Sequence, residues 1–129
     1  MRSDKTKARI VIPVEDDSVL NAQLAQHFGR APFYAVISLD ENGQVTNVET
    51  VKNVGEHFGG EGHMHDHILE LKPDAIITHG IGPRGLSGFQ NMRIAVLKAN
   101  SDTVKEVINA YKKGALQELT EGCLHSHSH

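Results

Sequence analysis

Short apolar runs alternate along this chain with polar stretches that contain glycine, a pattern typical of a small α/β protein. Five runs predict strands, over residues 8–14, 33–39, 44–51, 74–78 and 93–97. Asn42 and Gly43 stand between the second and third runs, and both residues tolerate positive φ, so we expect an antiparallel hairpin there. The second half alternates strands with helices. The pattern therefore predicts a mixed sheet of about five strands covered by helices.

Four segments are expected to be helical: 19–26 as a brief turn, 64–71, 83 to 89 or 91, and 104–111. Pro73 stops the second segment, because proline cannot continue a helix. Pro83 suits the first position of the third. Thr103 and Glu106 resemble a capping box at the start of the fourth, and Gly114 suits its termination.

The chain of 129 residues predicts one domain, with a core over about 8–115 and a tail over 116–129 that is mobile unless metal orders it. The net charge of −3 does not favour a nucleic-acid partner. A single cysteine cannot form an internal disulfide, which fits a reducing compartment. We find neither a signal-peptide core nor a membrane-spanning run, so we expect a soluble protein of the cytoplasm.

All but two of the nine histidines lie in two polar stretches, 57–67 and 123–129. Neutral imidazole and thiolate are the side chains that bind transition metals best near pH 7. His63, His65 and His67 share one side of an extended loop, whereas His63 and His67 share one face of a helix. Either conformation brings at least two imidazoles together, so all three are candidate metal ligands. The alternative is a loop that scavenges metal without a physiological role.

The tail carries a further candidate pair, because the only cysteine, Cys123, stands two residues before His125. We expect this tail to capture metal or to hold a cluster transiently. The alternative is a solvated and dispensable tail. The chain has no Cys-x-x-Cys pair, so the spacing of a closed zinc site is absent from the sequence.

Two segments that contain glycine are candidates for binding an anion. In the first, His27 offers a ring nitrogen and Arg30 a planar fork of donors; the alternative is a histidine that caps local backbone and a solvated arginine. In the second, Gly80, Gly82 and Arg84 lie between a strand and a helix, where backbone N–H groups bind anions; the alternative is a tight turn. We expect both segments at the same edge of the sheet.

Motifs of catalysis are missing from the sequence. It contains neither a Gly-x-Ser-x-Gly elbow nor a His-Glu-x-x-His helix. Glu15, Asp16 and Asp17 crowd one loop, where a solvated turn is a better interpretation than a site for a hard cation. We therefore expect no catalytic residues and a protein that is not an enzyme.

Several stretches carry a family resemblance: His-Phe-Gly-Arg-Ala-Pro-Phe-Tyr at 27–34, Gly-Gly-Glu-Gly-His at 59–63, Thr-His-Gly-Ile-Gly-Pro-Arg at 78–84, and a helix before the Cys/His tail. Together they resemble the dinitrogenase iron–molybdenum cofactor biosynthesis family, from about Ala8 onward. The resemblance implies a three-layer α/β/α, ribonuclease-H-like fold that carries or stores metal–sulfur clusters. It makes His27 the first candidate ligand, with Arg30 as its anion partner. Position 79 is histidine where many members have glycine, which either adds a ligand or fills a gap.

Three functions follow as hypotheses. The first is non-catalytic binding, carriage or storage of an iron–sulfur or iron–molybdenum–sulfur cluster or its precursor. The second is a chaperone or buffer for divalent transition metals, which uses the histidine-rich loop and the tail. The third is a regulatory module that binds a small anion. For the first we expect cluster donor or acceptor proteins as partners, and we expect a monomer or weak homodimer that contacts neither nucleic acid nor membrane.

Overall fold

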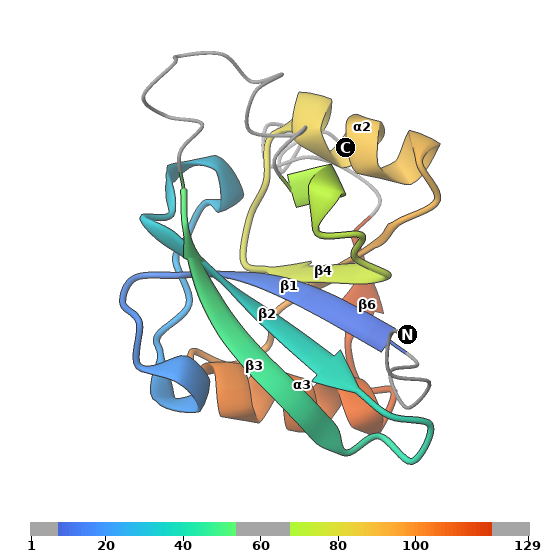
Figure 1. Ribbon diagram of the computed structural model, residues 1–129. Helices are drawn as coiled ribbons and strands as arrows, with labels where there is room; N and C mark the ends of the chain where they lie inside the picture. The colour runs from blue at the N-terminus through green and yellow to red at the C-terminus, as the bar shows by residue number, and fades with distance from the viewer. Residues whose placement is uncertain (1–7, 54–67, 120–129) are drawn as a thin grey trace.

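The computed structural model describes residues 8–53 and 68–119, which form a mixed sheet with helices on both faces (Figure 1). The described strands pair in the order β3-β2-β1-β4-β5-β6. β1, β4 and β5 are parallel, and each remaining strand is antiparallel to its neighbour. The strands are β1 (Ala8–Val14), β2 (Phe33–Leu39), β3 (Val45–Lys52), β4 (Ala75–Thr78), β5 (Ala95–Lys98) and β6 (Gln117–Glu118). The helices are α2 (Pro83–Asn91) and α3 (Val104–Lys112), and the 3-10 turns are η1 (Val19–Asn21) and η2 (Phe28–Arg30). This is the predicted three-layer α/β/α, ribonuclease-H-like architecture, with one strand more than expected.

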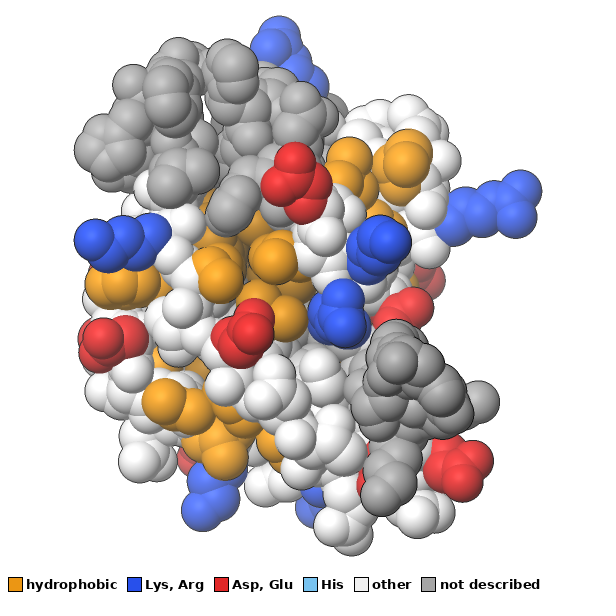
Figure 2. Space-filling model, in the orientation of Figure 1, with side chains coloured by type: hydrophobic (Ala, Val, Ile, Leu, Met, Phe, Trp, Pro, Cys, Tyr) orange, Lys and Arg blue, Asp and Glu red, His pale blue; other side chains and the backbone are white. Residues whose placement is uncertain are grey.

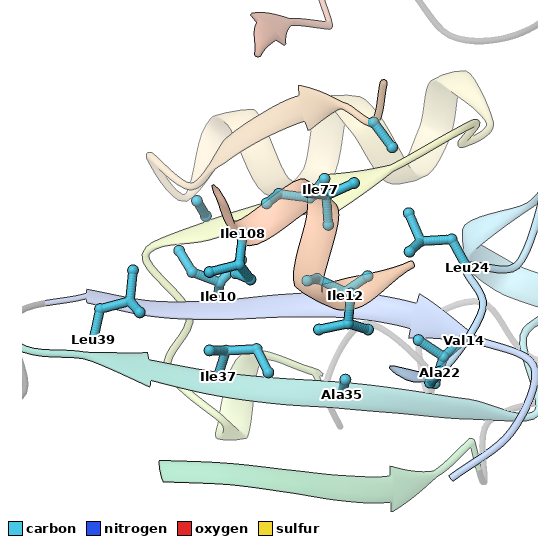
Figure 3. Close-up of a cluster of buried hydrophobic side chains, with 14 residues drawn as sticks. Ile10, Ile12, Val14, Ala22, Leu24, Ala35, Ile37, Leu39, Ile77 and Ile108 are labelled. Carbon is cyan, nitrogen blue, oxygen red and sulfur yellow. The ribbon is translucent and has the colours of Figure 1, made fainter. Parts of the chain in front are cut away.

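Side chains of the central strand β1 alternate between the two faces of the sheet, as the pleat of a strand requires. Ile10 and Ile12 pack in the cluster that lies against α3 (Figure 3), whereas Val11 packs in the cluster on the α2 face. All three are fully buried, and burying an aliphatic side chain of this size stabilises a fold by about 1.5–3 kcal/mol. The helices complete the clusters with Val104, Val107 and Ile108 on one face and Leu86 and Phe89 on the other.

The predicted hairpin between β2 and β3 is confirmed, but its turn differs in detail. Of the turn residues, Gly43 has a positive φ, +81°, whereas Asn42 does not adopt one. Asp40 closes the turn: its Oδ1 accepts the N–H groups of Asn42 at 2.8 Å and Gln44 at 2.9 Å. Because the Asp40 carboxylate accepts these backbone N–H groups, the turn closes without a positive φ at Asn42.

Both ends of α3 follow the prediction. The N–H of Glu106 donates to Thr103 Oγ1 at 3.4 Å, and the hydroxyl of Thr103 donates to Glu106 Oε1 at 3.0 Å. At the other end Gly114 has φ +69°, and the N–H of Ala115 donates to the carbonyl of Ala110 at 2.9 Å. This is the arrangement in which a glycine in left-handed conformation satisfies the last carbonyls of a helix.

Three predicted segments differ from what is observed. Within 19–26 only η1 is helical. Gln23 and Leu24 instead form isolated β-bridges, with Thr103 and Val14 respectively. Of the helix expected over 64–71, residues 64–67 lie outside the described residues, 68–70 are helical as predicted, and the helix ends one residue earlier than expected. The last predicted strand begins at Ala95 rather than at residue 93, because Arg93 turns the chain with φ +66°.

The start of the expected tail is also different. We predicted a mobile tail from residue 116, yet Gln117–Glu118 forms strand β6 against β5. The N–H of Leu119 continues this pairing by donating to the carbonyl of Val96 at 2.8 Å. Both residues of β6 are exposed, so no hydrophobic alternation marks this strand in the sequence.

Charged side chains of both signs are interspersed on the face shown in Figure 2, rather than gathered into one cationic patch. This distribution agrees with the small net charge of −3. Within residues 8–53 and 68–119, no helix combines the length and apolar character needed to cross a membrane.

Tyr111 carries a pH-dependent part of the stability. Burial, and then the negative charge of Asp74, raise the pKa of Tyr111 above its ordinary value of 10.0. The folded state therefore holds the phenol proton more tightly than the unfolded chain. The resulting stability is fully present below about pH 10 and is lost as pH rises through the higher folded pKa.

We therefore expect Tyr111→Phe to flatten the alkaline loss of stability. The measurement is the free energy of unfolding in urea at neutral pH and at several values above about pH 10. The two proteins should lose stability by different amounts, the variant less than the wild type. Parallel curves would show that the phenol does not titrate differently in the folded state.

Candidate functional site

Three loops meet at the edge of the sheet where the parallel strands β1, β4 and β5 end. These loops are residues 15–32, 79–82 and 99–103. Backbone hydrogen bonds join them: the N–H of Leu24 donates to the carbonyl of Asp102 at 2.8 Å, and the N–H of Phe28 donates to the carbonyl of Gly80 at 2.9 Å. Open α/β sheets bind their ligands outside the carboxyl ends of their strands. The geometry therefore makes this edge the candidate site.

A buried aromatic ring anchors the first of these loops. Phe28 is fully buried, and its ring centroid lies 5.0 Å from that of Tyr34 and 5.5 Å from that of Phe89. Tyr34 Oη also donates a 2.7 Å hydrogen bond to the carbonyl of Phe28. His27 and Arg30 flank this anchor and are both exposed. The loop thus presents an imidazole and a guanidinium on a backbone whose position is set by packing.

Asn53 holds the same loop from the other side. Its side chain is 5% exposed, and Nδ2 donates to the carbonyls of Gly29 at 3.3 Å and Ala31 at 2.8 Å. Its backbone N–H donates to the carbonyl of Pro32 at 3.0 Å. Asn53 is the last described residue before the histidine-rich stretch. The chain directly after β3 is therefore fixed beside the loop that carries His27.

The second loop combines a buried glycine with an exposed one. Gly80 is buried, and its carbonyl accepts two hydrogen bonds, one from Thr78 Oγ1 at 3.0 Å and one from the N–H of Phe28. The second of these bonds joins this loop to the loop that carries His27. Gly82 is exposed at the N-terminus of α2, directly before Pro83, which begins the helix as predicted. Among the residues that the structure describes, an added Cβ at Gly82 would meet nothing within 4 Å, so these residues leave the approach to the first turn of α2 open. Arg84 lies in this turn and is exposed.

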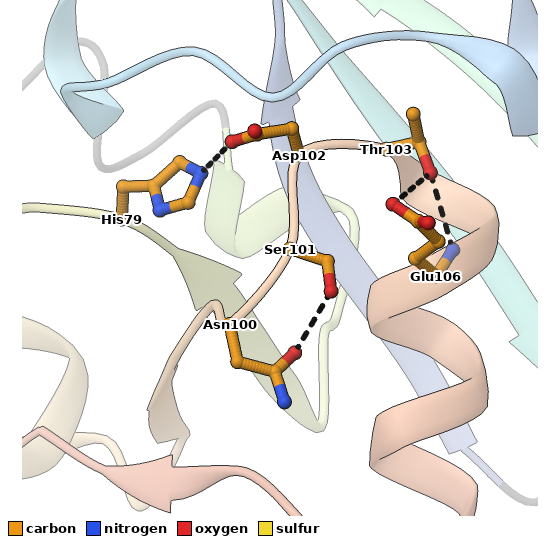
Figure 4. A network of polar contacts seen from close by, with 6 residues as sticks. All are labelled: His79, Asn100, Ser101, Asp102, Thr103 and Glu106. Carbon is orange, nitrogen blue, oxygen red and sulfur yellow. Dashed lines mark hydrogen bonds and ion pairs between the residues drawn. The ribbon is translucent and has the colours of Figure 1, made fainter.

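The third loop contributes a carboxylate that the sequence did not single out. His79 Nε2 lies 3.1 Å from Asp102 Oδ1, with side-chain exposures of 20% for the histidine and 71% for the aspartate (Figure 4). Asp102 stands just before a capped helix, where acidic residues are ordinary, so position alone does not mark it. Asn53 has no sequence signal either, apart from being polar directly after a strand.

The acidic residues after β1 behave as the solvated turn that we expected. Asp16 Oδ1 accepts the N–H of Ser18 at 2.8 Å. Hydrogen bonds from the side chain and the backbone of Ser18 hold the pKa of Asp16 below its ordinary value of 3.8. In the described part of the chain, no three or more His, Cys, Asp or Glu side chains gather closely enough to hold a metal ion.

Of the predicted metal ligands, His27 lies in the described structure. The others lie outside it and their roles stay predictions: His63, His65, His67, Cys123 and His125. The described residues that precede them lie differently in the sheet. Asn53 lies at the site edge, whereas β6 runs antiparallel to β5 and so heads away from that edge.

The comparisons with known proteins agree with this fold. A family model described as "Dinitrogenase iron-molybdenum cofactor" matches residues 8–114. The chain is 30% identical over 113 residues to the uncharacterised protein MJ0580 of Methanocaldococcus jannaschii, covering 86% of this chain and 91% of that protein. The crystal structure of PH0822 has 28% identity and a TM-score of 0.73, covering 86% and 94% of the two chains. The apo form of the orange protein from Desulfovibrio gigas has 19% identity and a TM-score of 0.76 over 92% and 98%, which is a likeness of fold. The chain belongs to the dinitrogenase iron–molybdenum cofactor family.

Proposed function

We propose that this protein binds and carries a metal–sulfur cluster at the carboxyl edge of its sheet and catalyses no reaction. The cargo is an iron–sulfur or iron–molybdenum–sulfur cluster, or a precursor of one. The observation that carries the proposal is the exposed pair of His27 and Arg30 on a loop held by the buried Phe28 ring. Membership of the iron–molybdenum cofactor family supports the choice of cargo.

The chemistry of these side chains suits an anionic cluster. The imidazole of His27 supplies a nitrogen ligand to one metal. The guanidinium of Arg30 is always charged and donates hydrogen bonds, which stabilise a cluster through its sulfur atoms. Arg84 and the N-terminus of α2 add positive potential at the same edge. One or two protein ligands hold such a cargo weakly enough for it to be passed on.

The described residues fit a cluster better than a bare metal ion. A structural zinc ion takes about four protein ligands. The described edge offers no group of three potential ligands. Within a preformed cluster, bridging sulfide already satisfies most of the coordination of each metal. An exposed imidazole with a neighbouring guanidinium therefore suits this cargo, whereas an ion buffer would depend on the histidine-rich stretches.

A carrier needs a donor and an acceptor, so we propose cluster-assembly proteins as its partners. A chain with a single cysteine, which cannot form an internal disulfide, suits a reducing compartment, so we propose that the protein acts in the cytoplasm. The cargo edge is the surface that such partners would have to reach.

The test is anaerobic reconstitution with iron and sulfide, followed by desalting and measurement of the visible absorbance of the cluster. We expect the wild type to retain a cluster, and His27→Ala to retain about tenfold less, because a metal ligand is lost. Arg30→Ala should weaken retention too, since the anionic charge loses its partner. Lys112→Ala is the matched control, because Lys112 is an exposed cation beside Gly43 in the hairpin at the other end of the sheet.

Two results would count against the proposal. Equal retention by the wild type and His27→Ala would remove His27 from the site. Binding of zinc, nickel or copper without sulfide would favour the ion buffer, if it survives His27→Ala and is lost on removal of residues 123–129.

A further inference from the structure

We infer that His79 is a second protein ligand to the cluster and that Asp102 positions it. This inference rests on the proposed function and deepens it, since it adds a nitrogen donor and a positioning carboxylate to the same edge. The sequence left open whether His79 adds a ligand or fills a gap, and it did not single out Asp102. The inference rests on the contact between His79, in the loop after β4, and Asp102, in the loop after β5.

The backbone places residue 79 beside the His27 loop. His79 directly precedes Gly80, and His27 directly precedes Phe28. The N–H of Phe28 donates to the carbonyl of Gly80 at 2.9 Å, so the two histidines each precede one partner of the same hydrogen bond. The carbonyl of Asp102 accepts the N–H of Leu24 from the same segment at 2.8 Å. All three loops are therefore joined where the two imidazoles occur.

The side-chain geometry then orients the ring of His79. Nε2 lies 3.1 Å from Asp102 Oδ1, and the other ring nitrogen faces away from the carboxylate (Figure 4). A carboxylate accepts hydrogen bonds, so it keeps the proton of a neutral imidazole on Nε2 and leaves the lone pair on Nδ1. Histidines that bind metals commonly donate their other ring N–H to a carboxylate in this way.

The exposed fractions of the two side chains indicate that Asp102 orients the ring of His79 rather than stabilising the fold. Asp102 is 71% exposed, so its carboxylate stays hydrated and the contact with His79 contributes little to folding. The ring of His79 is 20% exposed, so it is largely enclosed yet still reachable from the edge. A ring held in one orientation with a lone pair available is what a loosely coordinated cluster requires.

The experiment is pulsed EPR on the full chain reconstituted with iron and sulfide and then reduced, with histidine labelled with ¹⁵N. In the wild type we expect two classes of imidazole nitrogen coupled to the cluster, and in His79→Ala one class. Asp102→Asn should keep both couplings but retain the cluster about tenfold less after desalting, because the ring loses its orienting acceptor. Asp17→Asn, which changes another exposed carboxylate in a loop of the same edge, should leave both measurements unchanged.

The outcomes separate this inference from the proposed function. If the cluster depends on His27 and the His79→Ala spectrum keeps every coupling, His79 is not a ligand and the inference alone is overturned. If His79→Ala and Asp102→Asn change only the melting temperature, the contact between the two residues stabilises the fold without serving the cluster, and the inference is again overturned. If the wild type assembles no cluster, the proposed function fails and the inference falls with it. Because the Asp102 side chain is exposed, Asp102→Asn keeps the test valid even if His79→Ala does not fold.

Discussion

Replacing Phe28 with alanine is expected to lower the free energy of unfolding by about 3–5 kcal/mol, the usual cost of deleting a buried aromatic ring. The ring is fully buried and packs against Tyr34 and Phe89, so its removal leaves a cavity on the α2 face of the sheet. The same ring fixes the loop between His27 and Arg30. We therefore expect the folded fraction of Phe28→Ala to retain clusters poorly as well. Urea unfolding measures the first effect, and reconstitution below the unfolding transition measures the second.

Ile108→Ala is the matched control for this prediction. Ile108 is 2% exposed in the cluster on the opposite face, so its truncation should cost about 2–5 kcal/mol. It makes no part of the site, and its folded fraction should retain clusters as the wild type does. A loss below about 1 kcal/mol for Phe28→Ala would contradict the packing of the ring. Equal retention by both variants would contradict its role as the anchor of the site.

Asn53→Asp is expected to cost about 3 kcal/mol near neutral pH, although it changes only one atom of the side chain. Nδ2 donates to the carbonyls of Gly29 and Ala31 from a position that is 5% exposed. A carboxylate there would be buried and would face two acceptors, so it would destabilise the loop.

The cost should also depend on pH, because the buried carboxylate of this variant would have a raised pKa. A protonated acid can donate one hydrogen bond, and the folded state would bind that proton more tightly than the unfolded chain. The deficit relative to the wild type is therefore smallest below about pH 4 and grows as pH rises through the raised folded pKa. Unfolding curves across this range measure it. Asn47→Asp, on an exposed position of β3, the strand that ends just before Asn53, should show little cost at any pH; a similar profile for both would disprove the burial argument.

Elements were predicted well where the signal acts between neighbouring residues. Pro83 begins α2 and Thr103 caps α3 as expected, because each residue acts within the first turn of its own helix. β6 was missed for the opposite reason. Its residues are exposed, and only their pairing with β5 makes them a strand.

The same distinction applies to the site. His27 and Arg30 could be proposed from the sequence, because their chemistry resides in the side chains themselves. The supporting contacts could not, since Asn53 reaches the loop from the end of another strand. Gly80 shows the limit most clearly. The glycine turn suggested an N–H donor toward an anion, whereas the observed contacts use its carbonyl to receive Phe28 and Thr78.

The hydrogen bond between Phe28 and Gly80 joins two segments that are far apart in the sequence, so the cargo edge exists only in the folded chain. A ligand that binds the folded form alone shifts the folding equilibrium by mass action, by about 2.7 kcal/mol when its free concentration is a hundred times its dissociation constant. A cluster held at this edge would therefore protect its carrier against unfolding. Delivery would withdraw that protection, so the emptied protein would be the form most open to proteolysis.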